Sequence, residues 1–336
     1  FKTMFSVALA VCLMGNTVSA SELGITETEE VSEPVIEDSA VETVDVSAGD
    51  AVPEYATEEY AVEEHTEEIP AEGATTGLTY TVEGDTVTIT GEGECWTDGS
   101  ELQNAIKNAQ HVIFRDCKIK GSMKEAFYQC SNLQSIDLSG LDTSQVTDMR
   151  FMFSWCKNLK SLDASGFVTS RVWSMSGMFM GCSGLESLDI SNFDTSNIIG
   201  KVGGDIDDMF FGCSSLTSLD LSSFDTSRIA SMSNTFRSCS SLTSLNINGF
   251  DTSAVVSMNS MFSCCSNLSS LDLSGFNTSN VVNFNGMFLG CSSLESLNVD
   301  GFDTSQGLKM CSMFNGCSKL TKLDVSGFDT SQVSSM

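Results

Sequence analysis

The sequence predicts an α/β repeat solenoid, with a ladder of parallel strands on one face and short helical segments on the opposite face. Three observations predict it: a cysteine that returns at a fixed interval, a Leu-x-Leu pair with the period of a strand, and an apolar series with the spacing of a helix. Six of the seven intervals between these cysteines are 26 residues, and the remaining one is 31. They are Cys130, Cys156, Cys182, Cys213, Cys239, Cys265, Cys291 and Cys317. A unit of this length cannot bury its own apolar side chains, so the eight copies are expected to stack and share one core.

The first half of each copy reads Cys-x-x-Leu-x-x-Leu-x-Leu-x-x-Phe-Asp-Thr-Ser. Its Leu-x-Leu pair, as in Leu219 and Leu221, has period two and predicts a short strand. If the copies stack in register, equivalent side chains lie over one another. Examples are the series Leu216, Leu242, Leu268 and the series Phe224, Phe250, Phe276.

The second half predicts a short helical segment. Its apolar residues are three, three, one and three positions apart, as in Val172, Met175, Met178, Phe179 and Cys182. That spacing places them along one face of a helical turn or two. The preceding Asp-Thr-Ser supplies side-chain oxygens of the kind that cap a helix start.

Residues 1–20 are expected to be a secretory signal peptide whose true start is missing. Lys2 precedes the apolar run MFSVALAVCLMG, and the small residues Val18 and Ala20 suit cleavage after Ala20. Cys12 leaves lipidation open as an alternative. The run is too short to span a bilayer, so no transmembrane span is expected in this chain. An extracellular or cell-surface location follows.

Residues 21–76 are expected to be an acidic, disordered spacer. The formal net charge of the chain is −29, and 18 acidic side chains with no Lys or Arg lie between residues 21 and 74. A calcium-buffering or partner-binding tail is the alternative. No stripe of Lys and Arg runs along the rest of the chain, which argues against nucleic acid as a partner.

Residues 77–121 are expected to form an N-terminal cap that shields the first apolar edge of the stack. The stretch GLTYTVEGDTVTITGEG alternates on both sides of Gly84-Asp85 and predicts a β-hairpin. A helical piece and a strand near Val112 to Phe114 follow it. Residues 122–336 then hold the eight 26-residue repeats, the last of them truncated.

The repeat phrase LxSLDLSxFDTSxVxxMxxMFxGCSSL resembles that of the BspA-like leucine-rich-repeat surface proteins. The resemblance covers about residues 123–336. It implies a leucine-rich-repeat-like solenoid in a secreted or surface-attached protein, with adhesion attributed to some members and no shared catalytic residue. Local departures from the phrase include Ala164, Val168, Thr235 and Gly307.

The cysteines invite a disulfide interpretation, since an exported chain with 13 of them lies in an oxidising compartment. However, the eight repeat cysteines share one apolar position, which favours a ladder of buried thiols with parallel side chains. Cys95 and Cys117 flank the cap and form the best candidate for a bridge. There is no Cys-x-x-Cys pair, and His65 and His111 lie far from any group of cysteines, so neither a zinc site nor any cofactor is expected.

The candidate binding face is the outward-facing position between the two core residues of each strand. Its residues are Asp137, Asp163, Asp189, Asp220, Asn246, Asp272, Asn298 and Asp324. Like charges opposite one another on neighbouring strands repel, so this column has to be screened, partly protonated or bridged by cations. Three interpretations stay open: a solvated face on which Asp and Ser hydrogen-bond one another, a polar docking surface for a protein or glycan, and a calcium-bridged ladder.

The second repeated carboxylate, in Phe-Asp-Thr-Ser, is explained by turn and cap chemistry. Asn277 can replace it, but Val168 cannot, so the turn at Val168 is expected to be the weakest. Trp155 and Trp173 suit either irregular core packing or a small surface on which a sugar could stack. The repeats contain no His and no singled-out nucleophile, so no enzymatic activity is expected.

Together these features favour a non-catalytic surface or secreted binding protein that acts through its solenoid. The strand face and the inserted loop Gly200–Asp208 are the candidate contact regions, and the partner would be a protein or a glycan. Two alternatives remain: an inert surface spacer, and a targeting module of a larger extracellular enzyme.

Overall fold

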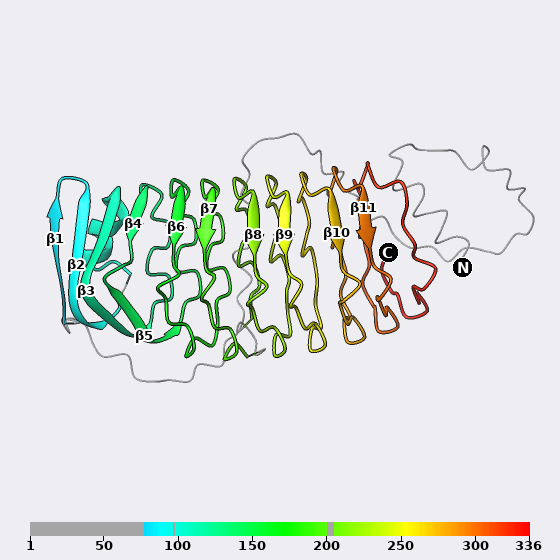
Figure 1. The fold of residues 1–336 in the computed structure, drawn as a ribbon, viewed down its shortest axis with the longest axis horizontal. Helices are drawn as coiled ribbons and strands as arrows, with labels where there is room; N and C mark the ends of the chain where they lie inside the picture. The colour runs from blue at the N-terminus through cyan, green and yellow to red at the C-terminus, as the bar shows by residue number, and fades with distance from the viewer. Residues whose placement is uncertain (1–76, 97, 200–204) are drawn as a thin grey trace, which may run out of the picture. The chain divides into compact units, whose positions relative to one another are not determined.

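The computed structural model describes residues 77–96, 98–199 and 205–336. These described residues form a stack of coils, one for each repeat, that begins with a β-rich cap (Figure 1). We number the coils from the repeat cysteine, so that coil 1 begins at Cys130 and coil 8 at Cys317. Within the described residues, no helix is long and apolar enough to cross a membrane.

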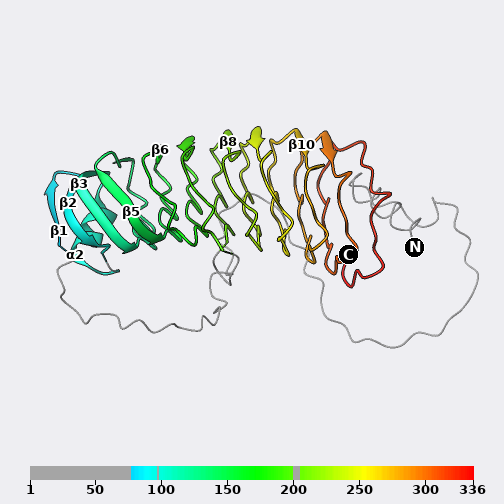
Figure 2. The same ribbon diagram turned by 60° about the horizontal axis from the view of Figure 1, so that its bottom comes forward.

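The cap is a mixed sheet backed by one helix (Figure 2). Strands β1 (Leu78–Glu83) and β2 (Thr86–Glu94) pair antiparallel around Gly84-Asp85, as the alternating sequence predicts. Strand β3 (His111–Ser122) then runs parallel to β2. Helix α2 (Glu101–Asn108) begins at Ser100, whose hydroxyl accepts a hydrogen bond from the backbone N–H of Gln103.

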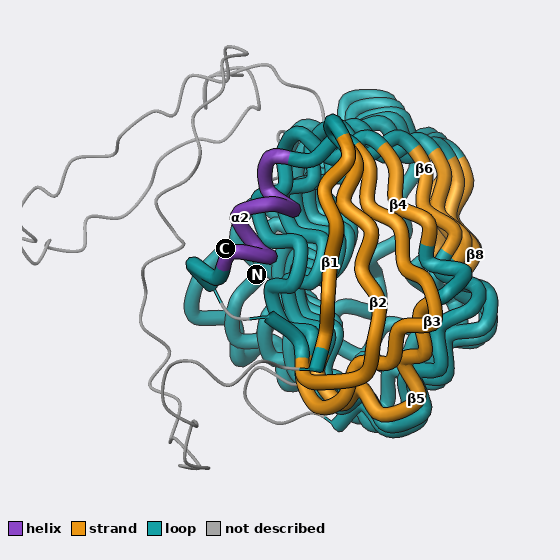
Figure 3. The backbone as a smooth tube through the Cα atoms, turned by 90° about the vertical axis from the view of Figure 1, so that its left-hand side faces the viewer, coloured by secondary structure: helices purple, strands orange, loops and turns teal. Residues whose placement is uncertain are grey.

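The repeats place their Leu-x-Leu segments on one side of the stack, which we call the strand face (Figure 3). Coil 1 contributes β4 and a longer strand, β5, both of which pair parallel with β3. Each of the next six coils contributes a strand of three residues with the sequence Ser-Leu-Asp or Ser-Leu-Asn. The bounds are β4 Ser135–Asp137, β5 Leu141–Asp148, β6 Ser161–Asp163, β7 Ser187–Asp189, β8 Ser218–Asp220, β9 Ser244–Asn246, β10 Ser270–Asp272 and β11 Ser296–Asn298.

The continuous strand ladder expected from the sequence is interrupted at alternate junctions. In the described repeats, β6 pairs with β7, β8 with β9 and β10 with β11, each pair parallel and in register. No sheet joins one pair to the next. Strands on the two sides of a paired junction have nearly the same residues as those on the two sides of an unpaired one, so the alternation is a property of the stacked coils and not of the strand residues.

The prediction of a helical face opposite the strands is wrong. In the described repeats this side consists of successive turns, and we call it the turn face. In Met149–Cys156, alternate backbone N–H groups bond in two different ways. Phe151 and Phe153 donate to carbonyls of the next coil at 2.9 and 2.8 Å, whereas Met152 donates three residues back within its own coil at 3.3 Å. The fold is therefore a β-solenoid with little helix.

The physical reason is a left-handed backbone at two positions of each turn segment, four residues apart. A right-handed helix cannot continue through such residues. The pairs are Glu125/Gln129, Phe151/Trp155, Gly177/Gly181, Asp208/Gly212, Asn234/Ser238, Ser260/Cys264, Gly286/Gly290 and Ser312/Gly316, with φ between 53° and 77°.

The core contains a continuous stack of phenylalanine rings, one from each turn segment. Neighbouring rings lie 5.1–5.8 Å apart between centroids and within 13° of parallel. The rings are Phe127, Phe153, Phe179, Phe210, Phe236, Phe262, Phe288 and Phe314. Each coil thus supplies the surface on which the next one packs, as the repeat pattern predicts.

Candidate functional site

The candidate binding column lies on the strand face, with one residue from each coil. Five of its aspartates are exposed, namely those at 163, 189, 220, 272 and 324, and the other three residues are half-buried. Each strand ends at its column residue because the carboxylate or amide oxygen accepts a hydrogen bond from the backbone N–H two residues later. Examples are Ser165 to Asp163 at 3.0 Å and Ser222 to Asp220 at 2.9 Å.

These local bonds favour the charged form of Asp163, Asp220, Asp272 and Asp324 by lowering the pKa of each. The hydroxyl of Ser165, followed by its backbone N–H, lowers the pKa of Asp163. Ser139 and Arg115 lower the pKa of Asp137 to about 2. Partial protonation therefore does not relieve the repulsion along the column at neutral pH. Relief comes instead from the amides in the column, since Asn246 donates from Nδ2 to Asp220 at 3.0 Å.

Calcium bridging has no preformed site on this face. Throughout residues 77–96, 98–199 and 205–336, no group of three or more His, Cys, Asp or Glu side chains could hold a metal ion. The column is a row of single carboxylates, each bonded to its own turn, and it presents polar groups at regular intervals.

The Phe-Asp-Thr-Ser aspartates lie at the next corner of each coil and make the same local bond, as in Asp225 with the N–H of Ser227 at 3.0 Å. Beside them runs a ladder of buried threonines that sequence reasoning missed. The hydroxyl of Thr278 donates to the carbonyl of Asp303 at 2.9 Å and accepts from its N–H at 2.8 Å. Val168 lacks the carboxylate bond but keeps both bonds to Thr143.

The repeat cysteines are buried free thiols. From Cys156 onward, each thiol donates to the carbonyl of the phenylalanine in the preceding turn segment at 3.0–3.2 Å, as Cys182 does to Phe153. Burial raises the pKa of Cys182 to about 12, which makes its thiolate scarce and the thiol unreactive.

The expected bridge between Cys95 and Cys117 is absent, because both are free thiols. Strand register explains this. Cys117 lies opposite Gly91, whereas Cys95 follows the end of β2, where Glu94 lies opposite Lys120. The two cysteines are therefore several residues out of register.

The inserted loop lies partly outside the described residues, which resume at Asp205. Asp205, Asp207 and Asp208 occupy positions that most other coils fill with Ser, Asn or Gly. The carboxylate of Asp207 accepts one hydrogen bond from the hydroxyl of Ser231 and one from the backbone N–H of Ser233, both at 2.6 Å. Burial raises the pKa of Asp207 to about 7 and that of Asp208 to about 6. The sequence DIDD carried this signal, since its acids replace residues that are small and neutral in most other coils.

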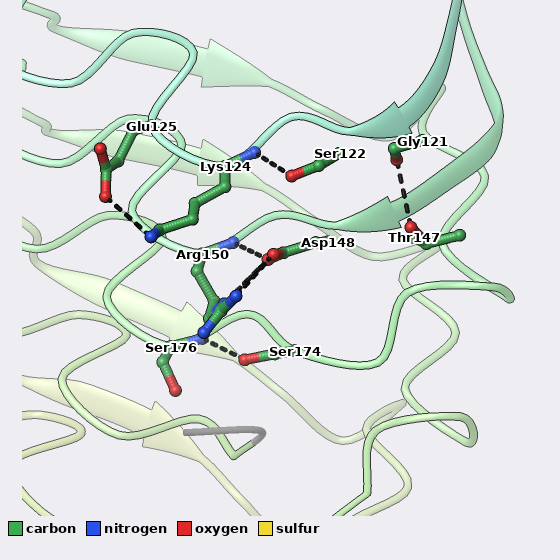
Figure 4. Close-up of polar contacts among 9 residues, drawn as sticks. All are labelled: Gly121, Ser122, Lys124, Glu125, Thr147, Asp148, Arg150, Ser174 and Ser176. Carbon is green, nitrogen blue, oxygen red and sulfur yellow. Dashed lines mark hydrogen bonds and ion pairs between the residues drawn. The ribbon is translucent and has the colours of Figure 1, made fainter. Parts of the chain in front are cut away.

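Trp155 and Trp173 are both half-exposed, and a cation lies over each ring. The guanidinium of Arg150 is 4.5 Å from the centroid of Trp173, and the ammonium of Lys157 is 5.3 Å from that of Trp155. The carboxylate of the buried Asp148 holds Arg150 in place through bonds of 2.9–3.2 Å (Figure 4).

A family model described as "Mycoplasma protein of unknown function, DUF285" matches residues 121–202, 204–297 and 272–336. No curated protein matches the chain.

Two solved structures are similar to part of this chain. A leucine-rich repeat protein from Eubacterium ventriosum ATCC 27560 is 14% identical with a TM-score of 0.27, over 75% of this chain and 95% of that one. The TLR13–ssRNA13 complex is 20% identical with a TM-score of 0.25, over 66% of this chain and 36% of that one. The chain thus spans little more than a third of the TLR13 chain that it matches.

Proposed function

We propose that this chain, which belongs to the family described as "Mycoplasma protein of unknown function, DUF285", is a non-catalytic binding protein that is exported to the cell surface. Its strand face would contact a partner protein or glycan. The resemblance of the repeat phrase to BspA-like surface proteins and the signal-like residues 1–20 support export and adhesion.

The observation that carries the proposal is the regular column of exposed, charged and locally fixed carboxylates on the strand face. Asp163, Asp220 and Asp272 are each held by a bond within their own turn, so they need no reordering to meet a partner. Preorganised polar groups lose little conformational entropy on binding. A repeating row of them fits an extended partner better than a small molecule.

The stack supplies its own matched substitution for testing this face. Asn246 and Asn298 occupy the column in two coils and accept the same turn bond from their oxygens at 3.3 and 3.1 Å. Changing Asp163, Asp220 and Asp272 to Asn should therefore preserve the fold while removing three charges. The control changes three Phe-Asp-Thr-Ser aspartates to Asn. The chain already has Asn at this position in one coil, where the oxygen of Asn277 accepts a hydrogen bond from the N–H of Ser279 at 3.1 Å.

The experiment is a binding array of extracellular-matrix proteins and glycans, probed with the exported chain and both triple variants. We expect a ligand whose binding falls at least about tenfold with the strand-face variant and changes little with the control. If no arrayed ligand binds, or if both variants bind equally, the strand face is not a binding surface. The spacer alternative then becomes the better explanation.

A further inference from the structure

We infer that the turn face of coils 1 and 2 binds an acidic polysaccharide through a second surface, the aromatic–basic patch of Phe151, Trp155, Lys157, Arg171 and Trp173. Phe151 and Trp155 belong to the turn segment of coil 1, and Arg171 and Trp173 precede that of coil 2, so the patch shares no residue with the column of the strand face. The inference therefore stands whether or not the strand face binds a partner.

The first argument is the backbone of the aromatic residues. Phe151 and Trp155 have φ of 54° and 64°, a left-handed conformation that bulky residues rarely adopt. The same column as Trp155 holds mostly small or flexible residues elsewhere: Gln129, Gly181, Gly212, Ser238, Cys264, Gly290 and Gly316. Sparsely populated backbone conformations gather at functional sites, where the surrounding structure sustains them. Gly177 and Gly181 of the next coil leave room for the rings of Phe151 and Trp155, and both side chains remain partly exposed to a ligand.

The second argument is the placement of the rings. Trp173 precedes the turn segment of coil 2, and Trp155 ends the turn segment of coil 1, so the two indoles lie at opposite ends of the turn face. Both are half-exposed, as is Phe151 between them. The guanidinium of Arg150, which is bonded to Asp148, packs over the ring of Trp173. Rigid flat rings lose little entropy when a flat apolar surface such as the C–H face of a pyranose covers them.

The third argument is local charge. Residues 107–171 hold nine basic and six acidic side chains, whereas residues 172–336 hold six basic and fifteen acidic ones. The repeat residues 122–171 themselves hold five basic and five acidic side chains, so the patch lies in a neutral part of an otherwise acidic stack. Lys157 and Arg171 are exposed, and neither has a carboxylate within ion-pair distance among the described residues. Unpaired cations beside half-exposed aromatic rings are complementary to a polymer that carries both sugar rings and carboxylates.

The test uses the full chain and immobilised hyaluronate and polygalacturonate, with dextran as the neutral glycan and polyglutamate as the acidic peptide. The central variant is Trp155→Gly. It removes the indole and relaxes the backbone strain, so it should fold normally. Ser238→Gly is its matched control, because Ser238 has a φ of 61° at the same position of another coil.

We expect Trp155→Gly to weaken binding to at least one uronate polymer about tenfold or more, and Ser238→Gly to leave it unchanged. Lys157→Gln and Arg171→Gln should each weaken it severalfold, and the affinity of the unaltered chain should fall with salt. These two surface changes also test the patch if Trp155→Gly does not fold.

Three results would overturn the inference. The first is failure of the unaltered chain to bind either uronate polymer. The second is equal binding to dextran, which would make charge irrelevant. The third is equal binding to polyglutamate, which would identify the patch as a site for acidic peptides.

Discussion

Gly181→Ala tests how closely the turn face is packed, because it adds one atom, a Cβ, next to the ring of Trp155. The glycine has a φ of 71°, and a Cβ added to it would lie 2.4 Å from Cε3 and 2.6 Å from Cδ2 of Trp155. Carbon atoms in contact are normally about 3.5–4.0 Å apart, so the indole has to move. The left-handed backbone costs an alanine about 1–2 kcal/mol, and overpacking adds about 1–3 kcal/mol. We therefore expect the free energy of unfolding to fall by about 2–5 kcal/mol.

Gly212→Ala separates the two contributions. Gly212 has a φ of 73°, but its added Cβ would meet nothing closer than the Cα of Gly181 at 3.6 Å, an ordinary contact. Gly212→Ala should therefore lower the free energy of unfolding only by the cost of the left-handed backbone, about 1–2 kcal/mol. Urea unfolding followed by circular dichroism measures both variants, and Trp155→Ala should remove most of the excess in Gly181→Ala. If Gly181→Ala costs no more than Gly212→Ala, the indole does not lie against Gly181.

Four further predictions concern the buried groups. Thr278→Val should lower the free energy of unfolding by about 1–3 kcal/mol, because two backbone groups of the next coil lose their partner; Thr278→Ser, which keeps the hydroxyl, should cost less in the same urea titration. Ser154→Ala should leave stability unchanged or raise it by about 1 kcal/mol, since the buried Ser154 hydroxyl has no hydrogen-bond partner, and a clear loss would show that this hydroxyl is bonded. The raised pKa of Asp207 means that the folded chain holds this proton more tightly than the unfolded chain, so its contribution to stability is lost as pH rises from about 4 to about 7. Asp207→Asn should therefore raise the melting temperature at pH 8, by about 2–4 °C for each kcal/mol of the lost contribution that it restores, and raise it much less at pH 4. Iodoacetamide at pH 8 should alkylate the exposed Cys264 and spare Cys239, whose pKa burial raises to about 12; mass spectrometry of the folded chain decides this.

The register of the stack could be predicted because each coil repeats the same phrase. Leu219 lies opposite Leu245, as a 26-residue period requires. The hairpin around Gly84-Asp85 could be predicted for a different reason, since strand alternation and turn chemistry agree there. Both predictions depend on local sequence or on exact repetition.

The turn face was mispredicted because apolar spacing alone does not determine backbone handedness. Met175, Met178 and Cys182 would lie on one side of a helix, but they also lie on one side of a series of turns. Gly177 and Gly181, four residues apart, carried the missing signal, because glycine is favoured where φ is positive. The strained aromatic residues in the equivalent positions of coil 1 concealed it.

The alternate pairing of strands could not be predicted from any one repeat. Strands β7 and β10 have the same three residues as β6 and β8, yet each finds its partner on only one side. Likewise, the candidate column could be located by its outward position, but the turn bonds that hold its carboxylates depend on geometry.

The stacked phenylalanine rings have a consequence for how such a chain changes in length. Every coil presents to its neighbour the same aromatic surface that it receives from the other side. A gain or loss of one whole 26-residue unit therefore rejoins two surfaces that already match. A shorter change keeps the later columns aligned only if it leaves the stacking residues in place, as the five additional residues between Cys182 and Cys213 leave Phe179 stacked on Phe210. Chains of this kind can differ in reach by entire coils while the contacts within each coil stay the same.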